Sequence, residues 1–138
     1  MNHALKFFLH ALLLMAVAAS LGLAQNLKTY PGSQRDEKAS VEASKTAPDK
    51  ASDVYTTSDP FDTVFAFYKA LYKQDTKMPA AGPKLPSGKQ VQWAFFIIDG
   101  GENLRTSKYW MKIQRPYIGG TDGSDTRDLT VIQAVRSK

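Results

Sequence analysis

The side chains that could perform chemistry in this chain of 138 residues are mainly carboxylates. The two histidines are His3 and His10, and there is no cysteine. After residue 24, the sequence therefore excludes Ser-His-Asp and Cys-His catalysis, acid–base work by histidine, ordinary zinc, copper or haem ligation, and disulfides. We expect no enzyme, no cofactor and no metal, with a hydrolase that uses carboxylates alone as the remaining catalytic alternative.

Two groups of acidic residues come closest to a site. Asp122, Asp125 and Asp128 resemble part of a calcium loop, but their spacing differs from the EF-hand pattern, and calcium takes about six to eight oxygen ligands. Asp99 and Glu102 flank a glycine turn and have the residue types of the acid and base of a glycosidase. We therefore interpret the first group as a solvated hairpin loop. Asp99 and Glu102 are sequence neighbours at a turn with no cleft indicated, so we do not interpret them as a catalytic pair.

Binding chemistry is indicated on one predicted strand, residues 109–114, where side chains alternate between two faces. If a helix covers the Tyr109 face, the opposite face presents a tryptophan beside a lysine, which suits a partner protein, a sugar or a lipid head group. The next residues extend this patch around Pro116. The predicted partner-binding residues are Trp110, Lys112, Gln114, Arg115 and Tyr117. The alternative is that Trp110 packs beneath residues 35–52.

The element that must position these residues is an amphipathic helix predicted over residues 59–73. Asp59 is placed to cap it, and Pro60 suits the first helical position. Apolar side chains recur at helical spacing and form one stripe. This stripe consists of Phe61, Val64, Phe65, Tyr68, Leu71 and Tyr72. We interpret it as core rather than as the wall of a ligand pocket.

Four strands are predicted around this helix, at residues 53–57, 91–98, 109–114 and 129–135. The order is β-α-β-β-β, and the last three strands can pair through hairpins, which makes the sheet mostly antiparallel. The expected fold is therefore α+β, a two-layer sandwich with one main helix on the sheet.

The domain organisation follows from composition. Residues 1–24 have the layout of a signal peptide, with Lys6 before an apolar run and small residues before a cut after Ala24. The alternative is a retained membrane anchor, because the apolar run approaches the length of a span. Residues 25–52 are expected to be a polar, partly flexible segment with a turn at Tyr30-Pro31-Gly32 and a short helix or a mobile linker at residues 39–44. Residues 53–138 are the predicted α+β domain.

The charge of the chain bears on its partners. The formal net charge is +5, from 18 basic and 13 acidic residues, and removal of Lys6 with the signal peptide leaves 17 − 13 = +4. A mild positive charge favours anionic surfaces, but the basic residues are scattered, which argues against nucleic acid. We expect an envelope protein or an anionic surface as the partner, and no stable membrane insertion after cleavage.

Three stretches resemble a module of uncharacterised small exported bacterial proteins. They are Tyr30-Pro31-Gly32, then Tyr55-Thr56-Thr57-Ser58-Asp59-Pro60-Phe61, and then Val64 to Phe67-Tyr68. The shared features are a Tyr-Pro-Gly start, a Thr-Thr-x-Asp helix cap and a helix ending in Phe-Tyr, loosely covering residues 30–138. The resemblance carries no assigned activity. It implies that residues 30–32 belong to the folded domain as an added strand.

Together these features favour a periplasmic or secreted protein that acts as a non-catalytic binding or structural module of the bacterial cell envelope, through its open sheet face or an edge strand. One alternative is a carrier of a small apolar ligand held between helix and sheet, and another is the carboxylate-only hydrolase. An enclosed apolar cavity would favour the carrier, a flat Trp110–Lys112 face the module, and two buried facing carboxylates the hydrolase.

Overall fold

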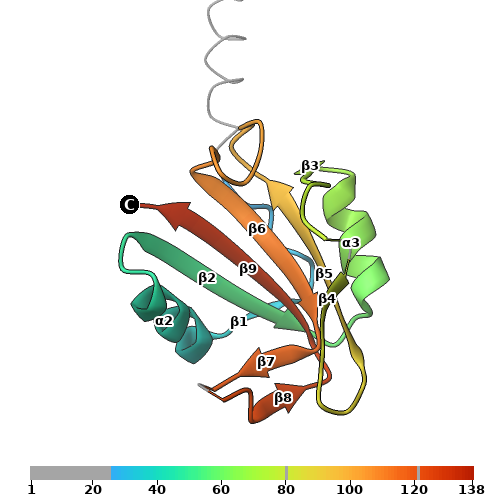
Figure 1. The fold of residues 1–138 in the computed structure, drawn as a ribbon. Helices are drawn as coiled ribbons and strands as arrows, with labels where there is room; N and C mark the ends of the chain where they lie inside the picture. The colour runs from blue at the N-terminus through green and yellow to red at the C-terminus, as the bar shows by residue number, and fades with distance from the viewer. Residues whose placement is uncertain (1–25, 80, 121) are drawn as a thin grey trace, which may run out of the picture.

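The structure is a computed structural model that describes residues 26–79, 81–120 and 122–138, so the predicted signal peptide lies outside the described part. A seven-stranded sheet stands between two helices, with a small hairpin at one end (Figure 1). All strand pairings are antiparallel. The predicted α+β sandwich is therefore confirmed. Among the described helices, none is long and apolar enough to cross a membrane.

The sheet has the strand order β1-β2-β9-β6-β5-β3, and β4 also pairs with β5. The helices are α2 (Glu37–Thr46) and α3 (Phe61–Lys69). The strands are β1 (Gln34–Arg35), β2 (Lys50–Thr57), β3 (Lys73–Gln74), β4 (Ala81–Lys84), β5 (Gln90–Ile97), β6 (Tyr109–Arg115), β7 (Tyr117–Gly119), β8 (Asp125–Arg127) and β9 (Thr130–Ser137). The four predicted strands correspond to β2, β5, β6 and β9, the four longest strands described.

The main core lies between α3 and one face of the sheet. Val64 and Tyr68 of α3 are fully buried against Met111 and Ile113 of β6 and Ile132 of β9. Alternation along β6 turns Lys112 to the other face. A helix therefore covers the Tyr109 side of the sheet, which is the condition on which the predicted patch depended, and the apolar stripe of the helix is core at these positions.

The start and end of α3 differ from the prediction. Asp59 does not cap the helix, because its carboxylate accepts a hydrogen bond of 2.6 Å from the Tyr30 hydroxyl. Pro60 is the residue before the first turn rather than the first helical residue. The helix ends at Lys69, so Leu71 follows it and is 42% exposed. The side chain of Asp59 therefore does not cap a backbone amide of α3. It binds Tyr30 and so anchors the segment upstream of β1.

The segment before residue 53 is largely part of the domain. Asp36 caps α2 by accepting a hydrogen bond of 2.9 Å from the Ala39 amide. Of the two predicted alternatives at residues 39–44, the structure has the helix, which is ten residues long. The predicted boundary between residues 52 and 53 falls inside β2. Tyr30 is buried in the main core, as the resemblance implies. Residues 30–33 form the predicted turn, in which the Ser33 amide donates to the Tyr30 carbonyl, and not the added strand that the resemblance implies.

The outer edge of β2 is closed by α2. The Val54 amide donates to the Ser40 hydroxyl at 2.9 Å, and the Ser52 amide donates to the Ser44 hydroxyl at 3.1 Å. Further along, the Lys50 amide donates to the carbonyl of Ala47, and β1 pairs with the end of the strand. An edge strand recruits partners through free backbone groups, and over the residues that α2 and β1 cover, this edge of β2 is closed to such binding.

Candidate ligand-binding groove

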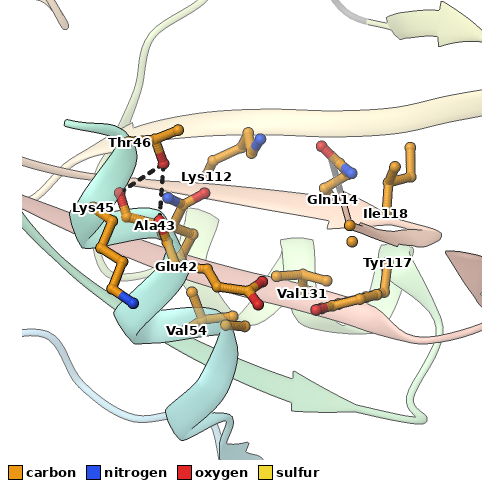
Figure 2. A pocket seen from close by; sticks show the side chains of 14 residues that line it. Glu42, Ala43, Lys45, Thr46, Val54, Lys112, Gln114, Tyr117, Ile118 and Val131 are labelled. Carbon is orange, nitrogen blue, oxygen red and sulfur yellow. Dashed lines mark hydrogen bonds between the residues drawn. The ribbon is translucent and has the colours of Figure 1, made fainter. Parts of the chain in front are cut away.

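A groove of about 740 Å³ lies on the sheet face opposite α3. Its floor consists of Val54 of β2, Lys112 and Gln114 of β6, and Val131 and Gln133 of β9. Helix α2 forms one wall and β7 forms the other. Figure 2 shows the α2 side chains on one side of the groove and those of β7 on the other. The volume falls within the range of about 300–1,000 Å³ that is usual for small-molecule sites.

The groove exists because α2 presents small side chains to the sheet. Ala39 and Ala43, four residues apart on one face of the helix, line the wall. Ala39 is buried with Val54 and Val131 in a second, smaller apolar cluster, separate from the main core. The methyl groups of Ala39 and Ala43 are too short to fill the space above the sheet, which longer side chains would occupy. The part of the wall that these two alanines form is therefore apolar and set back from the floor.

The opposite wall is tied to the first turn of α2. Tyr117 of β7 is buried, and the guanidinium of Arg127 lies 4.0 Å from the centre of its ring. Arg127 also pairs with the carboxylate of Asp36 at 3.7 Å, the same group that caps α2. Gly119 is required here, because a Cβ atom would lie 2.6 Å from a ring carbon of Tyr117. These contacts fix the distance between the two walls.

Lys112 is the one cationic side chain on the groove floor described above. It lies between Phe95 of β5 and Gln133 of β9 in the sheet register. Its ammonium makes no hydrogen bond or ion pair with any other described residue. Burial lowers the pKa of Lys112 from its ordinary value because a poorly solvated site disfavours the charged form. This cation is therefore available to an anionic group of a ligand.

Three of the five predicted binding residues come together in the groove, namely Lys112, Gln114 and Tyr117. Trp110 shares their sheet face but lies outside the lining, with its ring 6.2 Å from that of Phe95. Trp110 is also not one of the residues of the small apolar cluster in which Ala39 of α2 packs against Val54 and Val131. The face that carries Trp110 and Lys112 is therefore not flat, because a groove that Lys112 lines and Trp110 does not line lies on it.

Arg115 does not belong to the patch. Strand alternation places it on the same side as Ile113, and its guanidinium donates to the carbonyls of Asp59 and Asp128 and to the hydroxyl of Thr130. An ion pair of 3.1 Å with the Asp128 carboxylate completes these contacts. Arg115 therefore joins the turn before α3 to the turn before β9, which is a structural role.

The groove residues from α2 were missed in the sequence. They are Ala39, Glu42, Ala43, Lys45 and Thr46. Their composition is typical of an exposed helix or a linker, and no spacing indicated that the alanines face a sheet. Val131 and Gln133 had a usable signal, because they alternate with Ile132 and therefore share a face with the predicted patch once β9 pairs with β6.

The acidic residues near the 99–108 turn act as structural anchors. Burial alone would raise the pKa of Asp99, but hydrogen bonds from the Ser107 hydroxyl and three backbone amides outweigh it and hold the pKa below its ordinary value. Backbone amides of Leu104 and Lys77 likewise lower the pKa of Asp75. A carboxylate whose lone pairs are occupied is a poor general base, and Glu102 is exposed.

The carboxylates of the predicted hairpin loop each have a different partner. Asp122 accepts from the Ser124 amide, Asp125 pairs with Arg127, and Asp128 pairs with Arg115. Within the described residues, no group of three or more acidic, histidine or cysteine side chains is arranged to hold a metal ion.

Comparison with known proteins does not assign the chain to a family. No protein-family model matches it, and neither the curated proteins nor the solved structures give a significant match. The structure defines an α+β protein with a groove of ligand-binding size. This groove is the feature from which a function can be inferred.

Proposed function

We propose that this chain is a non-catalytic binding module of the bacterial cell envelope, whose ligand lies in the groove between α2, the sheet and β7. The observation that carries the proposal is the unpartnered ammonium of Lys112 on the floor of an otherwise mainly apolar groove. Sites for small molecules combine an apolar lining with a few polar groups that fix orientation. The apolar run in residues 1–24 supports export.

The carrier alternative is favoured by the same groove, which lies between a helix and the sheet. In this alternative the ligand lies against α2, whereas the sequence pointed to the helix predicted over residues 59–73. The space between α3 and the sheet is filled, because Val64, Tyr68 and Phe96 have no exposed surface there. A carrier would therefore use the α2 side of the sheet.

A hydrolase that uses carboxylates alone has less support. Such chemistry needs two carboxylates on either side of the reacting bond. Among the described residues that line the groove, Glu42 is the one that carries a carboxylate. Asp99 and Asp75 are occupied by backbone donors elsewhere, in the 99–108 turn and at the end of β3.

The proposal can be tested by native mass spectrometry of the chain, expressed with its own N-terminus in a bacterial host and purified from the soluble envelope fraction. We expect the wild-type protein to retain a bound small molecule, seen as a discrete added mass. Ala43→Trp fills the groove and should lose this mass. Lys38→Trp places the same side chain on an exposed position of α2 outside the groove lining and should retain it.

Circular dichroism and a thermal melt would establish that both variants are folded. The proposal is wrong if the wild-type protein carries no added mass and gains none when incubated with the small-molecule extract of its host. It is also wrong if a folded Ala43→Trp variant binds the same molecule as well as wild type does.

A further inference from the structure

We infer that the ligand of the groove is an amphipathic carboxylate, with an apolar body along the groove and one carboxylate on the ammonium of Lys112. This inference rests on the proposed function and adds the chemical class of the ligand. Its basis is the position of one unpartnered cation on the floor, in a lining whose apolar side chains come from α2, β2, β7 and β9.

The distribution of charge selects an anion. Lys112 is the lining cation that lies on the floor, whereas Lys45 is exposed on α2 at the wall. A partly buried ammonium without a partner is costly, and the lowered pKa of Lys112 reflects this cost. A carboxylate on the ligand would supply the missing partner through a charge-assisted hydrogen bond.

A single negative charge fits better than the two charges of a phosphate. Phosphate sites in proteins commonly use the bidentate fork of arginine or several converging donors. The described lining contains no arginine, and Glu42 adds a negative charge on the α2 wall. Lys112, Lys45 and Glu42 are the charged residues of the described lining, with a net charge of 2 − 1 = +1. This charge balances a monoanion, but a dianion would be left with uncompensated charge.

The apolar part of the ligand has a continuous surface on which to lie. Val54 and Val131 form the floor beside Lys112, and Ala43 lines the wall. Ile118 of β7 is 36% exposed and lines the groove from the other side. A ligand that covered Ile118 would bury one of the few large apolar side chains that the described surface exposes, and burial of such surface is the main source of affinity for apolar ligands.

The test uses decanoate and decanol, which share the same chain and differ in the anionic head. Isothermal titration calorimetry would be done with the wild-type chain, with Lys112→Met, and with Lys108→Met, which removes an exposed lysine outside the groove lining. We expect wild type to bind decanoate about 10- to 100-fold more tightly than decanol. Lys112→Met should remove this preference by weakening decanoate binding to the level of decanol binding, whereas Lys108→Met should retain the preference.

A series of carboxylates of increasing length tests the apolar half of the inference. Each added methylene should tighten binding by up to about fourfold until the groove is filled. A series without any dependence on chain length would overturn the inference, because the head group alone would then account for binding.

The outcomes separate this inference from the proposed function. If decanoate and decanol bind equally well, and Ala43→Trp abolishes both, the groove binds ligands but the carboxylate class is wrong. If neither amphiphile binds while native mass spectrometry shows a ligand that Ala43→Trp loses, the class is again wrong and the proposed function stands.

Discussion

The serine hydroxyl that closes the edge of β2 gives the sharpest prediction for stability. Ser40 is 2% exposed, and its hydroxyl accepts from the Val54 amide at 2.9 Å while donating to the Asp36 carbonyl at 2.7 Å. Ser40→Ala leaves the Asp36 carbonyl satisfied, because the Ser40 amide also donates to it at 3.0 Å. The one group left without a partner is the buried amide of Val54.

The expected cost follows from this single orphan group. An unsatisfied buried backbone donor costs about 1–3 kcal/mol. Alanine has a higher helix propensity than serine, which returns up to about 0.5 kcal/mol. We therefore expect Ser40→Ala to lower the free energy of unfolding by about 0.5–2.5 kcal/mol, measured by urea denaturation with an unchanged slope.

Thr46→Ala is the matched control for this measurement. It also deletes a hydroxyl from α2, but Thr46 is exposed and its hydroxyl bonds only to carbonyls of its own helix. Its effect should stay within about 0.5 kcal/mol. If Ser40→Ala costs no more than Thr46→Ala, the hydroxyl does not close the edge of β2 and the reasoning is refuted.

Three further predictions concern other parts of the molecule. Lys112→Met should raise the free energy of unfolding by about 0.5–2 kcal/mol in urea denaturation, because it removes a cation whose charged form is disfavoured by burial; an unchanged or lower stability would contradict this. Asp99→Asn should cost about 1–3 kcal/mol at pH 7, since its amide group meets backbone donors. The folded pKa of Asp99 is lowered, so its contribution is present above the unfolded value of about 3.9 and is lost as pH falls through the folded pKa; stability of the variant measured from pH 7 to 2 should lack this part of the acid loss. Tyr30→Phe, which removes the bond to Asp59, should cost about 0.5–1.5 kcal/mol, and an unchanged melting curve would show that this bond does not anchor the segment.

The long elements of the fold were predictable because periodicity reports burial directly. The continuous apolar run of β5 and the alternation of β6 gave their positions, and the stripe of α3 gave its buried face. The end of α3 was not predictable in the same way. Tyr72 fits the helical spacing, but its hydroxyl donates to and accepts from the backbone of residues 26 and 28, so it belongs to the turn after the helix.

The groove was only half predictable for a related reason. Alternation along one strand was enough to group Lys112 with Gln114, because both faces of a strand are determined locally. The walls depend on long-range contacts that leave little trace in composition. Nothing in Ala39 or Ala43 indicates that they face a sheet, and the cap at Asp36 also depends on Arg127, which is about ninety residues away in the chain.

Helix α2 joins the stability of the sheet to the proposed binding site. Ser40 and Ser44 close the edge of β2, and the neighbouring Ala39 and Ala43 form the groove wall. These two pairs lie on adjacent stripes of the same short helix, so a change that detaches α2 would free the backbone of β2 and remove the wall together. Such a change should cause both self-association through the exposed edge and loss of ligand. Lys112→Met changes only the charge of the floor and should cause loss of carboxylate binding alone, which is the difference expected if the helix forms the groove and the lysine selects what enters it.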